Sequence, residues 1–255
     1  MNESNYASLA LSCLDLTSLN DNDSESTIND LINKAFTPYG QVAAICIYSQ
    51  FVPFAKETLA NQGKALKIAT VVNFPNGEQS PDAVLKETES ALQNGADEID
   101  LVIPYSSFIR GDHIRVIDTV SAAHSVTLGN APLKVIIESG VLNTESLIRK
   151  ASEICIDNGA DFVKTSTGKV PINATLAAAE YILKTIAESG KTVGFKAAGG
   201  IGDTETAGKY IELAKSIMSD NYVTADTFRF GASSLLKNLL LNLSGQSETL
   251  PQKGY

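Results

Sequence analysis

Histidine, cysteine and basic side chains are scarce in this chain. Its 255 residues include two His, three Cys and no Trp, and 20 Lys and Arg stand against 29 Asp and Glu, for a net charge of -9. The acidic balance argues against a nucleic-acid partner, because phosphate backbones require clustered basic surface. Acidic surface instead favours solubility.

The chain also lacks the sequence marks of export and membrane insertion. Cys13, Cys46 and Cys155 form no C-x-x-C pair, and an odd number of cysteines does not indicate a disulfide framework. No basic segment followed by an apolar stretch opens the sequence, and no run approaches the roughly 20 apolar residues that span a bilayer. We therefore expect a cytoplasmic protein that contacts no membrane.

Short apolar runs rich in Val and Ile alternate with segments of helical length. Such runs are typical of parallel strands buried on both faces. Between them, polar caps followed by Pro or an acid and ending in Gly predict helices, as in residues 80–95 and 143–159. The expected strands lie at residues 13–17, 41–48, 66–72, 98–103, 133–137, 161–164, 192–196 and 227–231.

This alternation predicts an α/β fold, a (β/α)8 TIM barrel that forms a single domain over residues 1–255. We expect an extra N-terminal helix over residues 5–11 and a mobile tail over residues 244–255. An open, doubly wound sheet is the competing architecture. It loses support because the chain has neither a G-x-G-x-x-G turn after the first strand nor a G-x-x-x-x-G-K-[ST] motif.

Polar residues recur at the carboxyl ends of the predicted strands. In a barrel these ends share one face, where the catalytic residues gather. The rule does not say which side chains point inward. The candidates that it collects are Asp15, Cys46, Asn73, Asp100, Lys134, Glu138, Lys164 and Lys196.

Two of these candidates, Lys164 and Lys196, indicate amine chemistry. A lone strand-end lysine commonly extends its ammonium to solvent, but two of them suggest a nucleophile and a neighbour that perturbs it. A lysine is nucleophilic only when neutral, and a nearby cation or desolvation favours the neutral form. Asp100 lies within the strand over 98–103, where it is either a structural salt-bridge partner of Lys134 or Lys164, or an acid/base group that moves protons through water.

Three glycine-containing turns follow adjacent strand ends. Gly199-Gly200 follows the seventh strand, and Gly231-Ala232-Ser233-Ser234 follows the eighth and opens a helix. Barrels hold phosphate on backbone N–H groups and a helix N-terminus at this place. The segment 165–169, Thr-Ser-Thr-Gly-Lys, adds hydroxyls and a cation. Together the turns predict a phosphate site.

These residues resemble the deoxyribose-phosphate aldolases, and the resemblance runs almost from end to end. The family cleaves 2-deoxy-D-ribose 5-phosphate to acetaldehyde and D-glyceraldehyde 3-phosphate as a class I aldolase. The strings that carry the resemblance are Leu-Asp-Leu-Thr at 14–17, Ala-Ile-Cys-Ile-Tyr at 44–48, Gly-Ala-Asp-Glu-Ile-Asp at 95–100, Lys-Val-Ile-Ile-Glu at 134–138, Phe-Val-Lys-Thr-Ser-Thr-Gly-Lys at 162–169 and Arg-Phe-Gly-Ala-Ser-Ser-Leu-Leu at 229–236. Lys-Thr-Ser-Thr-Gly is the most specific of them.

The resemblance implies a role for each matching residue. Lys164 would be the Schiff-base lysine, Lys196 the neighbour that lowers its pKa, and Asp100 the acid of the proton relay. The residues that would hold the substrate and its phosphate are Thr167, Gly168, Lys169, Gly199, Gly200, Ser233 and Ser234, and the accessory residues would be Asp15, Cys46, Lys134 and the terminal Tyr255. It also implies a homodimer that acts on small sugar phosphates and aldehydes in deoxyribonucleotide catabolism, with no cofactor and no metal.

Two positions depart from the family pattern. Ala197 stands where the family has Pro, and Gly202 stands where it has a basic residue. The first loosens the loop after Lys196, since Pro restricts flexible states. The second removes a charge near the expected phosphate site. Phosphate affinity would then depend more on backbone N–H groups.

Four other interpretations stay open. A metal-dependent class II aldolase needs clustered histidines, whereas His113 and His124 fall within one predicted helix and are expected at the surface. A pyridoxal-phosphate enzyme would also use a Schiff-base lysine and a phosphate loop. A non-catalytic sugar-phosphate sensor would not need the two lysines and Asp100. Cys46 is expected to be a buried small hydrophobe, with alkylation by unsaturated aldehydes as a weaker hypothesis.

Overall fold

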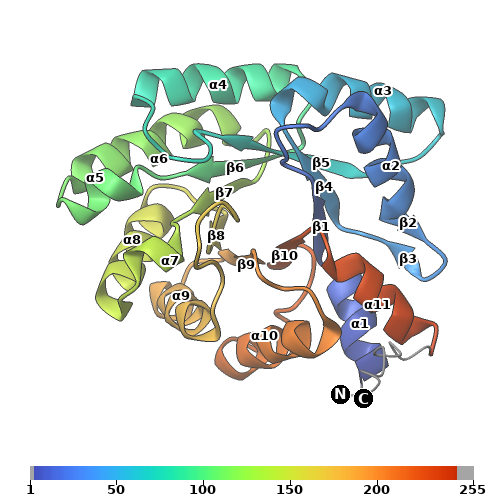
Figure 1. Cartoon of the computed structure of the whole chain (residues 1–255). Coiled ribbons are helices and arrows are strands. Elements are labelled where there is room, and N and C mark those ends of the chain that lie inside the picture. The colour runs from blue at the N-terminus through green and yellow to red at the C-terminus, as the bar shows by residue number, and fades with distance from the viewer. Residues whose placement is uncertain (1–2, 246–255) are drawn as a thin grey trace, which may run out of the picture.

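Eight parallel strands close into a barrel in this computed structural model, which describes residues 3–245 (Figure 1). Around the barrel the strands follow the order β1-β10-β9-β8-β7-β6-β5-β4. Their bounds are β1 (Leu14–Thr17), β4 (Ala44–Ile47), β5 (Lys67–Val72), β6 (Glu98–Val102), β7 (Leu133–Ile136), β8 (Phe162–Lys164), β9 (Gly194–Ala198) and β10 (Phe228–Ala232). All eight strands overlap the predicted runs, so the (β/α)8 prediction is confirmed and the competing open sheet is excluded.

Helices surround the barrel, with at least one after each strand. The longer ones are α2 (Glu25–Ala35), α3 (Val52–Asn61), α4 (Pro81–Gln93), α6 (His113–Thr127), α8 (Glu145–Asp157), α9 (Leu176–Ser189), α10 (Thr204–Ile217) and α11 (Leu235–Leu243). The short ones are η1 (Ser49–Phe51), α5 (Tyr105–Ile109) and α7 (Ser139–Leu142). None of the helices within residues 3–245 has the length and hydropathy needed to cross a membrane.

Two elements lie outside the repeated β-α units. The predicted N-terminal helix is present as α1 (Glu3–Ser12), and it packs against α10 and α11. A small antiparallel hairpin of β2 (Phe36–Thr37) and β3 (Gly40–Gln41) precedes β4. The sequence did not indicate this hairpin, because residues 41–43 continue the apolar run of β4 without a break in pattern.

The capping residues read from the sequence form the expected helix ends. The Ser80 hydroxyl accepts a hydrogen bond from the Ala83 N–H at the start of α4, and the Thr144 hydroxyl accepts one from the Leu147 N–H at the start of α8. Such caps satisfy N–H groups that have no partner within the helix. Gly95, after α4, has a φ of +98°, which favours glycine.

The apolar core lies between the strands and the helices, whereas much of the barrel interior is charged. The buried apolar side chains come from both the outward-facing strand positions and the inner faces of the helices. Inward-facing positions carry buried charges on β1, β6, β7, β8, β9 and β10. Barrel interiors are usually filled by branched apolar side chains. This departure makes the interior the candidate functional site.

Candidate active site

The strand register places the two predicted lysines side by side. Lys164, the last residue of β8, pairs in register with Lys196 of β9. Asp100 of β6 pairs with Lys134 of β7 on the same side of the barrel. Side chains at paired positions of neighbouring strands point to the same face. The register therefore brings the predicted nucleophile, its neighbour and the predicted acid into one interior.

Asp100 lies at the centre of this group and accepts hydrogen bonds from three ammonium groups. Its Oδ2 atom is 2.6 Å from Lys164 Nζ and 2.7 Å from Lys196 Nζ, and its Oδ1 atom is 2.9 Å from Lys134 Nζ. Asp100 and both Lys134 and Lys196 are fully buried, and Lys164 is 3% exposed. The sequence left open whether Lys134 or Lys164 is the ion-pair partner of Asp100, and the structure shows that Asp100 pairs with both.

A second layer of charges lies beneath Asp100. Arg229 donates to both oxygens of Glu98, at 2.8 and 3.1 Å, and also to Asp15. Asp15 accepts from Lys196, and Lys134 Nζ lies 2.6 Å from Glu98. Asp15 and Lys134, two of the four predicted accessory residues, therefore belong to the buried ion network rather than to a surface that a substrate reaches.

Arg229 and Glu98 are site residues that the sequence analysis did not collect. Both are buried, with Arg229 2% exposed. The rule that gathers strand-end residues passes over them because they lie further down their strands. The period-two pattern of a strand could have indicated them. Glu98 lies two residues before Asp100 on β6, and Arg229 lies two residues before Gly231 on β10, so each pair shares one face of its strand.

The buried network contains four bases and three carboxylates. The bases are Lys134, Lys164, Lys196 and Arg229, and the carboxylates are Asp15, Glu98 and Asp100. An unbalanced charge in a nearly dry interior is costly. The network therefore favours one neutral base.

Lys164 is the base whose environment favours the neutral form. Burial lowers the pKa of Lys164, the carboxylate of Asp100 opposes this effect, and the Lys196 cation adds to it. Burial acts in the same direction on the pKa of Lys196, but the carboxylates of Asp100 and Asp15 outweigh it and raise that pKa. Lys196 is thus held as a cation beside a lysine that loses its proton more readily.

The carboxylates are held in the charged form. Burial alone would raise the pKa of Asp100, but Lys134, Lys164 and Lys196 lower it well below its ordinary value. The pKa of Asp15 is likewise lowered by Lys196, Arg229 and Lys134 against the effect of burial. Asp100 therefore acts as a hydrogen-bond acceptor in the resting site.

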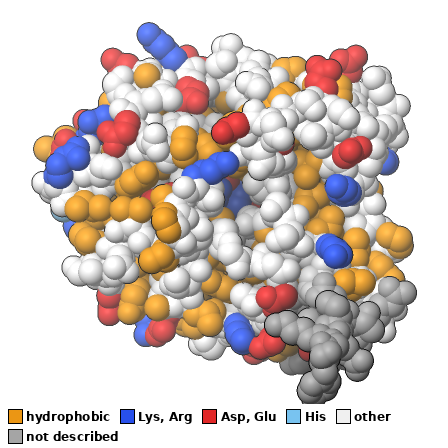
Figure 2. Space-filling model, in the orientation of Figure 1, with side chains coloured by type: hydrophobic (Ala, Val, Ile, Leu, Met, Phe, Trp, Pro, Cys, Tyr) orange, Lys and Arg blue, Asp and Glu red, His pale blue; other side chains and the backbone are white. Residues whose placement is uncertain are grey.

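A cavity of about 1130 Å³ opens above this network at the carboxyl ends of the strands. Figure 2 shows it as a hollow near the middle of this face, with Lys and Arg side chains at its edges. The structure brings all the predicted substrate and phosphate residues to its wall, together with the predicted nucleophile: Lys164, Thr167, Gly168, Lys169, Gly199, Gly200, Ser233 and Ser234.

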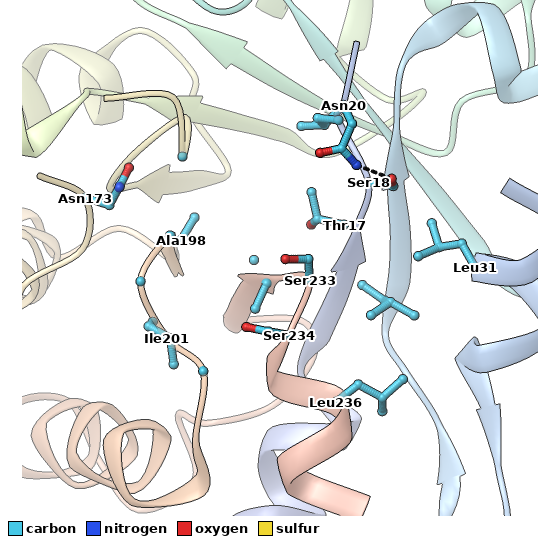
Figure 3. Close-up of a pocket in the computed structure, with 18 of the residues that line it drawn as sticks. Thr17, Ser18, Asn20, Leu31, Asn173, Ala198, Ile201, Ser233, Ser234 and Leu236 are labelled. Carbon is cyan, nitrogen blue, oxygen red and sulfur yellow. Dashed lines mark hydrogen bonds between the residues drawn. The ribbon is translucent and has the colours of Figure 1, made fainter. Parts of the chain in front are cut away.

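Two loops face each other across the cavity. Figure 3 shows Ala198 and Ile201 on one side, with Ser233 and Ser234 on the other, directed into the gap. Gly199 has a φ of +83°, and a Cβ added there would lie 2.7 Å from the Asn173 Cβ. Only glycine fits this turn, which allows the backbone to approach a ligand closely.

Lys169 does not stand free in the cavity. Its Nζ donates to the Leu19 carbonyl at 2.5 Å, and the Tyr48 hydroxyl donates to the same carbonyl at 3.3 Å. These contacts connect the loop after β8 to the loop after β1. Lys169 thus closes one side of the cavity mouth while its charge stays at the wall.

Glu138, at the start of α7, is a strand-end candidate to which the sequence assigned no role. Its carboxylate accepts from the Thr167 hydroxyl and from the Thr167 N–H. Burial raises the pKa of Glu138, while the hydrogen bonds from Thr167 and the charge of Lys164 oppose that effect.

The remaining sequence candidates lie away from the cavity wall or outside the described residues. Cys46 is fully buried, as predicted, and packs against Leu19, Ala69 and Val71. Asn73 is buried, and its side chain donates to the Val102 carbonyl. Tyr255, with residues 246–255 of the predicted tail, lies outside the described residues.

Both histidines lie on α6, within the predicted helix. Both are intermediate in exposure, so neither lies in the core and the expected surface position is not contradicted. His113 stacks on Phe108 with 4.8 Å between ring centroids, and the His124 ring packs closely against Gly159. Over residues 3–245 there is no group of three or more His, Cys, Asp or Glu that could hold a metal ion.

The chain is similar to known aldolases over nearly its whole length. Among solved structures, the aldolase QR15 shares 31% identity over 92% of this chain and 96% of its own, with a TM-score of 0.77. A provisionally named deoxyribose-phosphate aldolase from Coccidioides immitis shares 28% identity over 93% and 86%, with a TM-score of 0.80. One from Toxoplasma gondii ME49 has a TM-score of 0.88 over 97% and 99% at 24% identity, which shows the common fold. Residues 9–240 match the family described as DeoC/LacD family aldolase, and the chain therefore belongs to this family.

Proposed function

We propose that this protein is a deoxyribose-phosphate aldolase that works through a Schiff base on Lys164. It reversibly cleaves 2-deoxy-D-ribose 5-phosphate to D-glyceraldehyde 3-phosphate and acetaldehyde. The observation that carries the proposal is that Lys164 is the one member of the buried ion network that also lines the cavity. As parts of the same proposal, the enzyme acts in the cytoplasm as a homodimer and needs no cofactor.

The reaction begins at the aldehyde carbon. Neutral Lys164 attacks C1 to give a carbinolamine, which loses water to form an iminium. Asp100 contacts Lys164 Nζ but does not line the cavity, and it transfers protons to and from this nitrogen during the step. Lys196 keeps its own proton and favours the neutral amine of Lys164.

Cleavage then uses the iminium as an electron sink. The C3 hydroxyl loses its proton, the C2–C3 bond breaks, and its electron pair forms an enamine on Lys164. C3 becomes the aldehyde carbon of glyceraldehyde 3-phosphate. The enamine is protonated at C2, and water hydrolyses the resulting iminium to acetaldehyde and free Lys164.

Reduction with borohydride in the presence of deoxyribose 5-phosphate tests the nucleophile. We expect a stable adduct on the peptide that contains Lys164, because borohydride reduces an iminium to a secondary amine. Peptide mass mapping locates it. An adduct on another lysine would overturn the assignment, and a protein that cleaves the substrate without any adduct would overturn the Schiff-base mechanism.

The phosphate is proposed to lie between the turn at 199–200 and the start of α11. Gly199 and Gly200 supply backbone N–H groups, and Ser233 and Ser234 supply hydroxyls beside a helix N-terminus. Gly202 has no charged side chain that could contribute to phosphate binding here. Lys237 follows Ser234 by three residues on α11, lines the same cavity, and forms no ion pair with any residue in the described range 3–245.

Lys237→Ala is expected to raise the KM for deoxyribose 5-phosphate about tenfold, the loss typical of one charge-assisted contact. The KM for unphosphorylated deoxyribose should not change, because that substrate has no anion for Lys237 to meet. Lys86→Ala, an exposed lysine on α4 away from the cavity, provides the charge-matched control. An equal change in both KM values would show that Lys237 does not recognise the phosphate.

A further inference from the structure

Glu138 is held in an unusual conformation directly beside the proposed nucleophile loop. It follows β7, is fully buried, and has a φ of 55° and a ψ of 57°. A residue other than glycine seldom adopts this left-handed conformation unless its surroundings require it. Immediately after it, the Ser139 N–H donates to the Thr165 carbonyl at 2.7 Å. The backbone of Glu138 is thus fixed against the segment that follows Lys164.

The Glu138 side chain makes its hydrogen bonds with a single residue, Thr167. Its Oε2 atom accepts from the Thr167 hydroxyl at 2.5 Å, and its Oε1 atom accepts from the Thr167 N–H at 3.3 Å. Within residues 3–245 no ion pair is formed by Glu138. A buried carboxylate is costly without hydrogen bonds, and here both of its strong donors come from Thr167.

These contacts determine what the Thr167 hydroxyl offers to the cavity. A threonine hydroxyl has one proton and two lone pairs. The proton is given to Glu138, and one lone pair accepts from the Lys169 N–H at 3.0 Å. Thr167 lines the cavity with Lys164. The remaining lone pair is therefore all that this hydroxyl can present to a ligand, and the facing group of the ligand must be a donor.

We propose that Glu138 is a positioning residue that fixes the Thr167 hydroxyl as the acceptor for the C3 hydroxyl of the bound aldol. This inference rests on the function proposed above, in which the C3 hydroxyl is the group that loses its proton as the C2–C3 bond breaks. An acceptor held in place there orients the C3 O–H bond and takes its proton while Thr167 gives its own proton to the Glu138 carboxylate, so that the departing proton has a destination. Thr167 touches the substrate, and Glu138 acts through Thr167.

Glu138→Gln tests this role with almost no change in shape. The amide oxygen can still accept from the Thr167 N–H, but the amide NH₂ now donates to the Thr167 oxygen and turns its proton toward the cavity. Cleavage of deoxyribose 5-phosphate should fall about 100-fold in kcat, the lower end of the effect of a positioned acid–base group. Thr167→Val should fall similarly, and Thr167→Ser, which keeps the hydroxyl, should recover most of the rate.

A half-reaction that does not involve the C3 hydroxyl distinguishes a positioning role of Glu138 from a general disturbance of the loop after β8. Exchange of the acetaldehyde methyl protons with D₂O, followed by NMR, needs the Lys164 iminium and enamine but no C3 hydroxyl. We expect Glu138→Gln to keep the wild-type exchange rate within about threefold while its cleavage rate falls. Glu57→Gln, an exposed glutamate on α3, is the matched control for both measurements.

The outcomes distinguish this inference from the proposed function. Equal losses of exchange and cleavage in Glu138→Gln would make Glu138 structural and overturn the positioning role. Unchanged cleavage would overturn it as well, as would a further loss when Glu138→Gln is added to Thr167→Val, since a residue that acts through Thr167 has nothing left to position. A wild-type protein that neither exchanges acetaldehyde protons nor cleaves the sugar would instead contradict the proposed function.

Discussion

Lys164→Ala is expected to lower kcat/KM for cleavage of deoxyribose 5-phosphate by about 10,000-fold or more, as the loss of a covalent nucleophile does in other enzymes. The lysines of the buried network and of the loop after β8 cannot replace it. Lys134 and Lys196 are fully buried and do not line the cavity, and the Lys169 ammonium is occupied at the Leu19 carbonyl. Release of acetaldehyde from the phosphorylated sugar measures the effect.

The Lys164→Arg variant and thermal unfolding of both variants are the controls for this test. Arginine stays positively charged beside Asp100 and does not become a neutral nucleophile, so Lys164→Arg should be as inactive as Lys164→Ala. Asp100 retains Lys134 and Lys196 as partners in both variants, and Lys164→Ala, which adds no unbalanced charge to the buried network, should preserve the fold. A variant that melts near the wild-type temperature and keeps a tenth of the activity would show that Lys164 is not the nucleophile.

The architecture and the pairing of the lysines were accessible from the sequence because both depend on short-range patterns. Val and Ile runs between capped helices indicate β-α units, and the shared carboxyl end of the strands converts positions in the chain into proximity. The strand register agrees with the predicted proximity, since Lys164 and Lys196 occupy paired positions on β8 and β9. The same rule correctly gathered the glycine and serine residues of the cavity wall.

What the sequence did not reveal depends on side-chain direction and on loop paths. The period-two pattern places Arg229 on the same face of β10 as Gly231, but the pattern alone does not say that this face points inward. The left-handed conformation of Glu138, which aims its carboxylate at Thr167, has no signal in residue type, since glycine or asparagine is expected there. The cavity also extends toward α2 and α11, where Leu31 and Leu236 line it (Figure 3).

The charge balance of the interior changes the interpretation of Asp100. Sequence reasoning set a structural ion pair against an acid/base role; the geometry shows the ion pairs, and the acid/base role is part of the proposed function. A carboxylate that accepts from Lys164 and Lys196 at once holds the two amino groups close together, and in the proposed mechanism it exchanges a proton with Lys164. Removing its charge should therefore affect stability and catalysis together.

Asp100→Asn is expected to destabilise the protein by about 3–5 kcal/mol, because it leaves buried cations without their shared partner. For a chain of this length that corresponds to a fall in Tm of roughly 6–20 °C. Catalysis should fall by about 100- to 1,000-fold from loss of the proton-transfer group. Asp100 also opposes the loss of the Lys164 proton, so the acidic limb of the pH–rate profile should move to lower pH in the variant. Thermal unfolding and kcat across pH measure these effects.

The pH dependence of the stability difference identifies its electrostatic origin. Burial opposes ionisation of Asp100, but Lys134, Lys164 and Lys196 outweigh it and hold its pKa well below the ordinary value, so its contribution is fully present above the unfolded pKa of about 4 and is lost as pH falls below that value. The gap in stability between wild type and Asp100→Asn should therefore be constant from pH 7 to about pH 5 and narrow in more acidic solution. Asp118→Asn, an exposed aspartate on α6, should show no such gap. A gap that stays constant into acid would mean that Asp100 stabilises the barrel through packing rather than through its charge.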